Sequence, residues 1–147
     1  MVWLESSALG HAMRESGVWT YAVVNLIHIL GVATLFGAVL ILDLRLMGVW
    51  RTVSLPAIRQ PTVRMAGVGF AVASLSGVGL LATKATEYVG NPFLYIKFAA
   101  IGAGLLNVVL LSRTVAWKQD KELKLAGAIS LLCWLTAVIA GRMIGYW

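Results

Sequence analysis

The residues of this chain with the clearest chemical potential are one histidine and one lysine placed within long apolar runs. His28 lies near the middle of an uncharged run of 26 residues, from Gly17 to Leu42. Lys97 lies about one helical turn inside a later apolar run. An ionisable side chain in hydrocarbon is costly, so it generally marks a functional site or has a polar partner. Neutral imidazole can bind haem iron or another metal, pass a proton, or hydrogen-bond across a helix interface.

Polar side chains recur with helical spacing in two of the apolar runs. In the first run, Tyr21, Asn25 and His28 are separated by steps of four and three residues, which places them on one helical face. A polar stripe in a membrane should face other helices and not acyl chains. A second stripe, in the third run, has small residues between its polar ends: Lys97, Ala100, Gly104 and Asn107. Its small residues leave room for a flat group or for a close helix.

These stripes leave three interpretations of His28 open. In one, His28 is an axial ligand of a haem b held between helices, and Lys97 or His11 supplies the second ligand. His28 follows Trp19 by nine residues, or roughly 13 Å of helix, which is a suitable depth for a haem. In another, His28 hydrogen-bonds across the helix interface to Asn25, Asn107 or a serine. The third interpretation is a proton or metal path.

The other candidate residues also have structural interpretations. Lys97 is close enough to the membrane boundary to snorkel to the interface. His11 falls in a short N-terminal segment, where a solvated interfacial histidine is expected. Asp43 is expected at the inner headgroups, with Arg64 or Arg113 beside it.

Composition places the chain in a membrane. It has 147 residues, of which 60% are apolar and only 12% charged, against about 25% charged in soluble domains. The net charge of +6 is not read as a nucleic-acid signal, because the charges fall at the ends of apolar runs. The lipid bilayer is therefore the expected partner. The single cysteine, Cys133, excludes an intrachain disulfide and is expected to be a small packing residue.

The apolar runs predict an all-α, integral membrane four-helix bundle in a single domain, residues 1–147, with a short N-terminal interfacial segment. A span needs roughly 20 residues, and the predicted spans cover about 18–43, 65–84, 93–113 and 125–146. The first is expected to be a permanent span, because no basic region leads it and it is too long for a signal peptide. Pro56 and Pro61 disfavour one continuous helix between the first and second spans.

Short motifs locate helix starts and contacts within this bundle. Asn91 followed by Pro92 predicts a capped helix start at the third span. Gly69, Ala73 and Gly77 recur every four residues in the second span. Such small residues let helix backbones approach closely in lipid, so this ladder predicts a helix–helix contact.

Basic residues predict the orientation. Of the 12 lysines and arginines, eight follow the first and third spans: Arg45, Arg51, Arg59, Arg64, Arg113, Lys118, Lys121 and Lys124. The other four are Arg14, Lys84, Lys97 and Arg142. The positive-inside rule places the eight in the cytoplasm and both termini outside a bacterial inner membrane.

The sequence also lacks the common catalytic motifs. It has no glycine-rich phosphate loop, no Cys-x-x-Cys-His and no metalloprotease motif. No spacing singles out a nucleophile and its base. Any chemistry would therefore need a borrowed cofactor, and whether the chain is an enzyme is left open.

Several motifs resemble those of known membrane proteins. The chain resembles an uncharacterised bacterial family of small four-span inner-membrane proteins through these motifs: Trp3-Leu4-Glu5, His28-Ile29-Leu30-Gly31, Gly37, Leu42-Asp43-Leu44-Arg45, Asn91-Pro92-Phe93, Lys97 and Asn107. His28, Gly31 and Gly37 are similar to the His-x-x-Gly helix of CopD-type copper-resistance membrane domains. His28 with Lys97 is similar to the His and Lys pair of HemJ-type protoporphyrinogen oxidases. The latter resemblance implies haem binding.

Together these observations give two functional hypotheses from different classes. The leading one is a haem b-binding, redox-associated membrane protein that uses His28. The alternative is a non-catalytic accessory subunit or scaffold of a larger membrane complex, assembled as a homo-oligomer or with partner membrane subunits. A transporter is less favoured, because no broken helix is evident.

Overall fold

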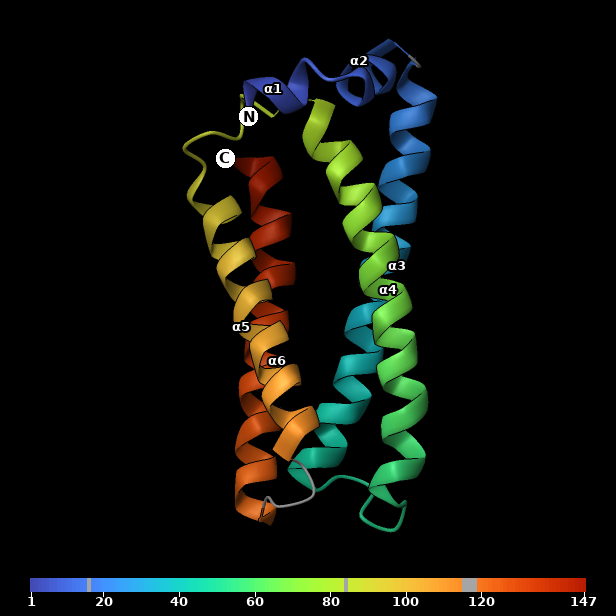
Figure 1. Cartoon of the computed structure of the whole chain (residues 1–147), viewed down its shortest axis with the longest axis vertical. Coiled ribbons are helices and arrows are strands. Elements are labelled where there is room, and N and C mark those ends of the chain that lie inside the picture. Colours follow the sequence, from blue (N-terminus) through green and yellow to red (C-terminus); the bar gives the residue numbers. More distant parts are fainter. Residues whose placement is uncertain (16, 84, 115–118) are drawn as a thin grey trace.

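The chain folds into a bundle of four long helices with two short helices at its N-terminus, as seen in a computed structural model (Figure 1). The structure describes residues 1–15, 17–83, 85–114 and 119–147. All regular elements in these residues are helical, as predicted: α1 (Val2–Glu5), α2 (Ala8–Glu15), α3 (Gly17–Met47), α4 (Leu55–Thr83), α5 (Pro92–Thr114), α6 (Asp120–Met143) and the 3₁₀ turn η2 (Ile144–Tyr146).

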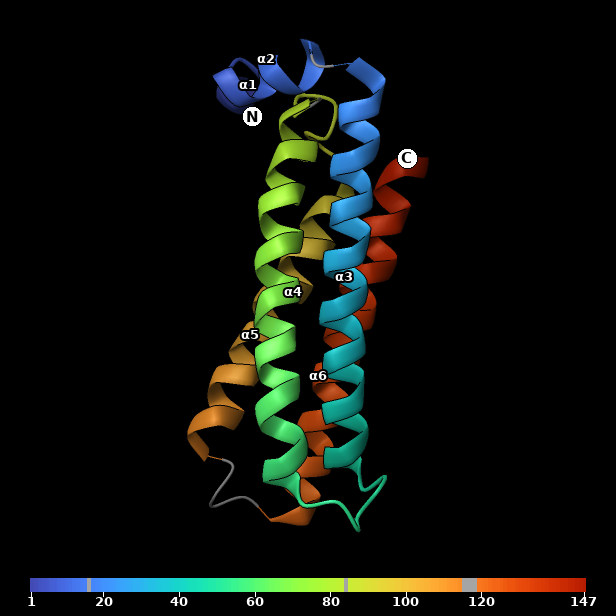
Figure 2. The ribbon, with the colours of Figure 1, turned by 90° about the vertical axis from the view of Figure 1, so that its right-hand side faces the viewer.

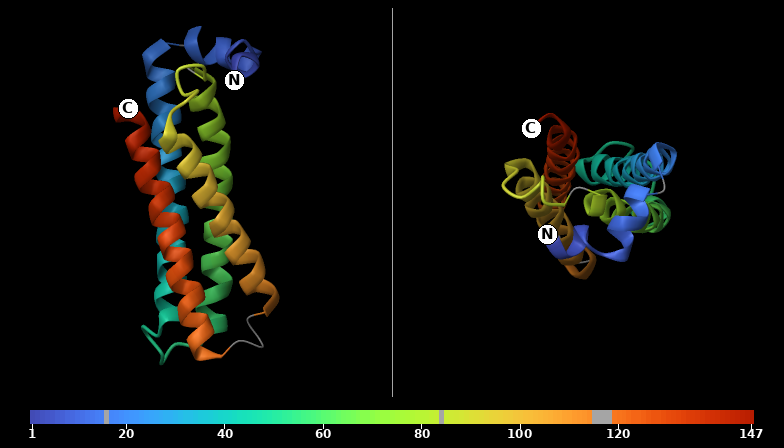
Figure 3. Two further views of the ribbon diagram at one scale, coloured as in Figure 1. Left: turned by 90° about the vertical axis from the view of Figure 1, so that its left-hand side faces the viewer. Right: turned by 90° about the horizontal axis from the view of Figure 1, so that it is seen from above.

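The long helices form two antiparallel pairs, α3 with α4 and α5 with α6, and the pairs meet mainly where α3 contacts α6 (Figures 1 and 2). Helices α3 to α6 are each long and apolar enough to cross a membrane. Large apolar side chains, such as Leu75, Leu106 and Leu132, are exposed along them. Since lipid can solvate such side chains, the chain is a multi-pass membrane protein by these criteria. Both termini lie at the same end of the bundle (Figure 3).

Small residues at the α3–α4 contact bring these two helices close together. A Cβ atom on Gly69 would lie 2.5 Å from the backbone nitrogen of Leu35, and one on Gly31 would lie 2.7 Å from that of Ala73. The backbones are therefore nearly in contact at both glycines. The predicted ladder of Gly69, Ala73 and Gly77 is confirmed as a helix–helix contact within the chain.

Pro56 and Pro61 were expected to lie in the connection between the first and second spans. The connection is shorter than that, because α3 ends at Met47 and α4 begins at Leu55. Pro56 stands in the first turn of α4, where a missing N–H costs little, but Pro61 lies inside the helix. A proline at this position removes the backbone hydrogen bond that the helix would otherwise form to the Ala57 carbonyl. Thr62 donates its hydroxyl to the Ile58 carbonyl at 2.8 Å in the same turn.

Two helix starts follow their sequence signals. Asn91 is buried and its Oδ1 accepts a hydrogen bond of 3.0 Å from the backbone N–H of Phe93, which confirms the predicted cap of α5. At α6, the backbone N–H of Gln119 donates to Oε2 of Glu122 at 3.0 Å. The charged segment before the fourth span therefore forms the first turn of α6, except for Lys118, which lies outside the described residues.

An indole ring fills the centre of the bundle. Trp134 is buried against Leu35 and Val39 of α3 and meets the Phe70 ring edge-on, with ring centroids 6.4 Å apart. A Cβ atom on Gly104 would lie 3.0 Å from the Trp134 ring. The close approach of α6 agrees with one of the two expectations for this stripe, and the space beside Gly104 is occupied by the Trp134 side chain of that helix.

The N-terminal helices are attached to the end of α4. Oε2 of Glu5 accepts hydrogen bonds from the backbone N–H and the hydroxyl of Thr86, at 2.7 Å and 2.6 Å. Arg14 donates to the carbonyl oxygen of Thr83, the last residue of α4, at 3.4 Å. The two hydrogen bonds from Thr86 hold the pKa of Glu5 below its ordinary value of 4.5. The predicted interfacial segment is thus a pair of docked helices.

Candidate functional site

His28 contacts the backbone of the neighbouring helix. Its Nδ1 atom lies 2.9 Å from the carbonyl oxygen of Ala73 and 3.3 Å from Oγ of Ser76, both on α4. A Cβ atom on Gly77 would lie 3.1 Å from the imidazole ring, so the last glycine of the small-residue ladder gives the ring its space. This contact agrees with the interhelical hydrogen bond to a serine that was one interpretation of His28.

The geometry at Ala73 determines which ring nitrogen of His28 carries hydrogen. A carbonyl oxygen can only accept, so Nδ1 must be the donor in this hydrogen bond. The Ser76 hydroxyl is itself 2.6 Å from the Val72 carbonyl, to which it donates, so its oxygen can accept from Nδ1. In the neutral ring, Nε2 then holds the free lone pair. No residue in the described part of the chain hydrogen-bonds to Nε2.

Lys97 lies on α5 with its side chain along α6. It is half-buried, and its Nζ atom would lie 3.5 Å from a Cβ atom on Gly141. His28 and Lys97 thus lie in different helix pairs, and each contacts the partner helix of its own pair: His28 contacts α4, and Lys97 contacts α6.

The remaining residues of the predicted stripes do not converge on His28. Tyr21 is 42% exposed, and Asn25 is half-buried. Asn107 donates from Nδ2 to the carbonyl oxygen of Ala126 at 3.0 Å, so its amide joins α5 to α6. His11 is exposed on α2, at the terminal end of the bundle.

Asp43 is buried at the contact between α3 and α6. It is 2% exposed, and its carboxyl group is near the buried hydroxyl of Ser130. A Cβ atom on Gly127 would lie 3.0 Å from the backbone oxygen of Asp43, so the helices are close here. Oδ2 of Asp43 has no hydrogen-bond partner within the described residues. Asp43 therefore lies in a contact between helices, one turn before the end of α3, and its depth relative to the headgroups stays a prediction.

Comparison with known proteins assigns a family but no activity. A model of the Family of unknown function (DUF6644) matches residues 1–147. The chain belongs to this family. No curated protein and no solved structure matches the chain. The sequence-based expectation of an uncharacterised family is confirmed, and the function of this DUF6644 chain has to be argued from its own site.

A conventional metal centre is not formed within the described residues of this DUF6644 chain. They contain no group of three or more His, Cys, Asp or Glu side chains placed to hold a metal ion. Cys133 is half-buried and free of disulfide bonds.

Sequence reasoning overlooked Asp43 and Trp134 as interior groups. Both signals were present, since Asp43 follows the uncharged run directly and Trp134 lies well inside the last one. Small residues lie opposite both groups. Gly127 faces the backbone oxygen of Asp43, and Gly104 faces the Trp134 ring.

Proposed function

We propose that this chain is a haem b-binding, redox-associated membrane protein in which Nε2 of His28 would bind the haem iron. The supporting observation is the hydrogen bond of 2.9 Å from Nδ1 of His28 to the Ala73 carbonyl. A histidine that binds a metal generally donates its other ring N–H to a carbonyl or carboxylate, which fixes the tautomer and the ring orientation. His28 donates from Nδ1 in this way, and none of the described residues hydrogen-bonds to its Nε2 atom. Nε2 is therefore free to bind a metal.

The residues that would hold the haem are those nearer the terminal end of the bundle. Trp134 fills the space beside Gly104, so the group would be held by His28 together with Lys97 and not by the whole stripe of α5. A neutral Lys97 amine would serve as the second ligand, and a charged one would pair with a haem propionate. His11, exposed on α2, is the less favoured second ligand. When bound, the haem would supply one-electron transfer.

The visible spectrum of the purified protein tests this proposal. Protein from haem-replete cells is expected to show a Soret band with redox-sensitive bands, and haem b in a pyridine haemochrome assay. His28→Gln keeps a side-chain donor for the Ala73 carbonyl but has no imidazole. It should insert and fold while losing the haem, whereas His11→Gln should retain it. Colourless wild-type protein under these conditions would overturn the proposal.

Chemical rescue separates ligation from folding. His28→Ala removes the ring, and added imidazole should restore the Soret band if the site itself remains intact. Lys97→Met should shift the spectrum or weaken haem retention if the amine is the second ligand. An unchanged spectrum in Lys97→Met would assign that lysine to snorkelling or propionate binding.

A second candidate function is that of an accessory subunit or scaffold in a larger membrane complex. The observation that favours it is that His28 and Asn107 both hydrogen-bond to neighbouring helices, at Ala73 and Ala126, as packing groups do. In that case His28→Gln should leave both the spectrum and the assembly unchanged, and the native complex should contain further copies of the chain or other membrane subunits.

We further infer a location in a bacterial inner membrane with both termini outside. The helix ends support the grouping of charges used for this inference: all described basic residues of the larger group lie near the end of the bundle away from the termini. Lys84 and Lys118, which also entered the prediction, lie outside the described residues. An excess of lysine and arginine at one end is the signal that orients such bundles.

A further inference from the structure

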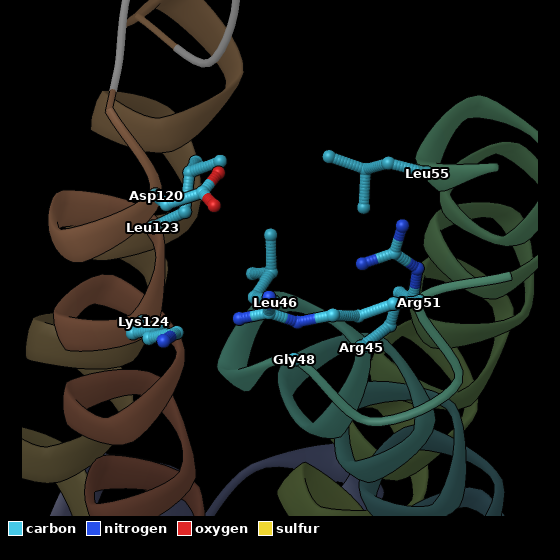
Figure 4. Close-up of a pocket in the computed structure, with 8 residues that line it drawn as sticks. All are labelled: Arg45, Leu46, Gly48, Arg51, Leu55, Asp120, Leu123 and Lys124. Atoms are coloured by element: carbon cyan, nitrogen blue, oxygen red, sulfur yellow. The ribbon is translucent and has the colours of Figure 1, made fainter. Parts of the chain in front are cut away.

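A charged pocket lies at the end of the bundle away from the termini. It has a volume of about 240 Å³ and opens between the α3–α4 connection and the beginning of α6. Figure 4 shows Arg45 and Arg51 on one side of it, with Asp120 and Lys124 of α6 on the other. None of these residues belongs to the site around His28, and the pocket has no role in the haem proposal.

The backbone around the pocket holds the two arginines in place. Nε of Arg45 donates to the carbonyl oxygen of Val53 at 2.8 Å, which leaves its terminal nitrogens available. Gly48 has a φ of +107°, and a Cβ atom there would lie 3.0 Å from Nε of Arg51. Only a glycine fits both this backbone conformation and the close approach of the arginine side chain.

The pocket carries excess positive charge. Three basic side chains, Arg45, Arg51 and Lys124, line it together with one carboxylate, that of Asp120. None of these three is within ion-pair distance of Asp120, and all four residues belong to the described part of the chain. These groups would be most stable with an anion between them.

We propose that this pocket binds the phosphate group of an anionic phospholipid or a free phosphate. A guanidinium group can donate two parallel hydrogen bonds to the oxygens of one phosphate. Two guanidinium groups, those of Arg45 and Arg51, line this pocket. The apolar part of the lining is formed by Leu46, Leu55 and Leu123. Such side chains can contact the glycerol backbone of a lipid, whereas a free phosphate ion has no apolar part for them to contact. The pocket lies where α3 and α4 connect and α6 begins, at one end of the four apolar helices. Basic pockets between transmembrane helices characteristically hold such headgroups.

Lipid retention tests the lipid form of the proposal. The full-length protein is placed in nanodiscs of phosphatidylcholine alone or with added phosphatidylglycerol, and retained lipids are measured by native mass spectrometry after release. Wild-type protein should retain phosphatidylglycerol selectively. Arg51→Gln should lower that retention about tenfold, as the loss of one charge-assisted contact implies. Arg113→Gln, which removes an exposed charge of α5 at the same end of the bundle, should leave retention unchanged.

Inorganic phosphate in phosphatidylcholine nanodiscs tests the other source. A rise in melting temperature with phosphate but not with chloride at equal ionic strength, lost in Arg51→Gln, would identify a free phosphate as the ligand. Gly48→Ala, which should displace the Arg51 side chain without changing any charge, should weaken binding in whichever form is found. No selective retention and no phosphate effect would overturn the proposal, as would equal losses in Arg51→Gln and Arg113→Gln.

Discussion

Nδ1 of His28 lies 2.9 Å from the carbonyl oxygen of Ala73, so a polar side chain of α3 reaches the backbone of α4 within a span. This distance depends on the small residues that let the two helices approach. Ala73 and Gly31 are in near contact at the same level, and Gly77 leaves space for the ring. The orientation of His28 is therefore a consequence of helix packing as much as of the histidine itself.

Enlarging the small-residue contact should separate the helices. Ala73→Leu is expected to lower the melting temperature in detergent, because a buried position with no spare volume cannot take three more carbon atoms without strain, typically about 1–3 kcal/mol. The variant should also lose haem if the proposed site is correct. An unchanged melting temperature and elution profile would contradict the contact between α3 and α4.

Two glycines of α4 offer a matched comparison. Gly69→Ala should destabilise the bundle, because its new Cβ would lie 2.5 Å from the backbone nitrogen of Leu35. Gly67→Ala makes the same change on the same helix, where a Cβ would have no atom within 4 Å. It should leave the melting temperature equal to or slightly above that of the wild type, because alanine favours a helix over glycine. Equal effects of the two changes would contradict the packing described.

Docking of the N-terminal helices should depend on pH through Glu5. The hydrogen bonds from Thr86 hold its pKa below 4.5 in the folded protein, so they favour the ionised form. Their contribution is therefore fully present above that ordinary value and is lost as pH falls through the lowered, folded-state pKa. Proteolysis between the N-terminal helices and α3 should become faster in this acidic window. Glu5→Gln should show fast cleavage already at neutral pH, with little further change on acidification.

The buried pair of Asp43 and Ser130 should be energetically coupled. Removing either group leaves the other buried without its polar neighbour, which typically costs about 1–3 kcal/mol. In a double-mutant cycle with Asp43→Ala and Ser130→Ala, the free energy of unfolding should show a coupling of about 1 kcal/mol. Thermal or denaturant melts in detergent provide the measurement. Strictly additive effects would show that the pairing contributes nothing to stability.

The inferred topology predicts which loops are accessible from outside the cell. In a background where Cys133 is replaced by serine, Thr52→Cys and Gln119→Cys should resist membrane-impermeant maleimides in intact cells and react after lysis. A cysteine at Val89, in the connection before α5, should react in intact cells. Labelling with the opposite pattern would reverse the orientation.

The sequence alone determined the membrane class, the helical fold and much of the helix order. Uncharged runs of this length have few alternatives to a membrane helix, because backbone polar groups need internal partners in lipid. Local signals were equally reliable: Asn91 caps α5, and the ladder from Gly69 to Gly77 lies at a helix contact. Such signals act within one turn or one helix face, so they can be read without knowing the partner.

Only the tertiary structure decided which side chains share a space. Helical periodicity predicted that the residues from Lys97 to Asn107 in the stripe share one helix face. It could not predict that Trp134 of α6 fills the space beside Gly104. It likewise did not reveal that Asp43 would be buried against Ser130, or that Arg45, Arg51 and Lys124 would enclose one pocket. These groupings depend on the rotation and spacing of helices distant in sequence. Side-chain volumes set that spacing through packing across the whole bundle.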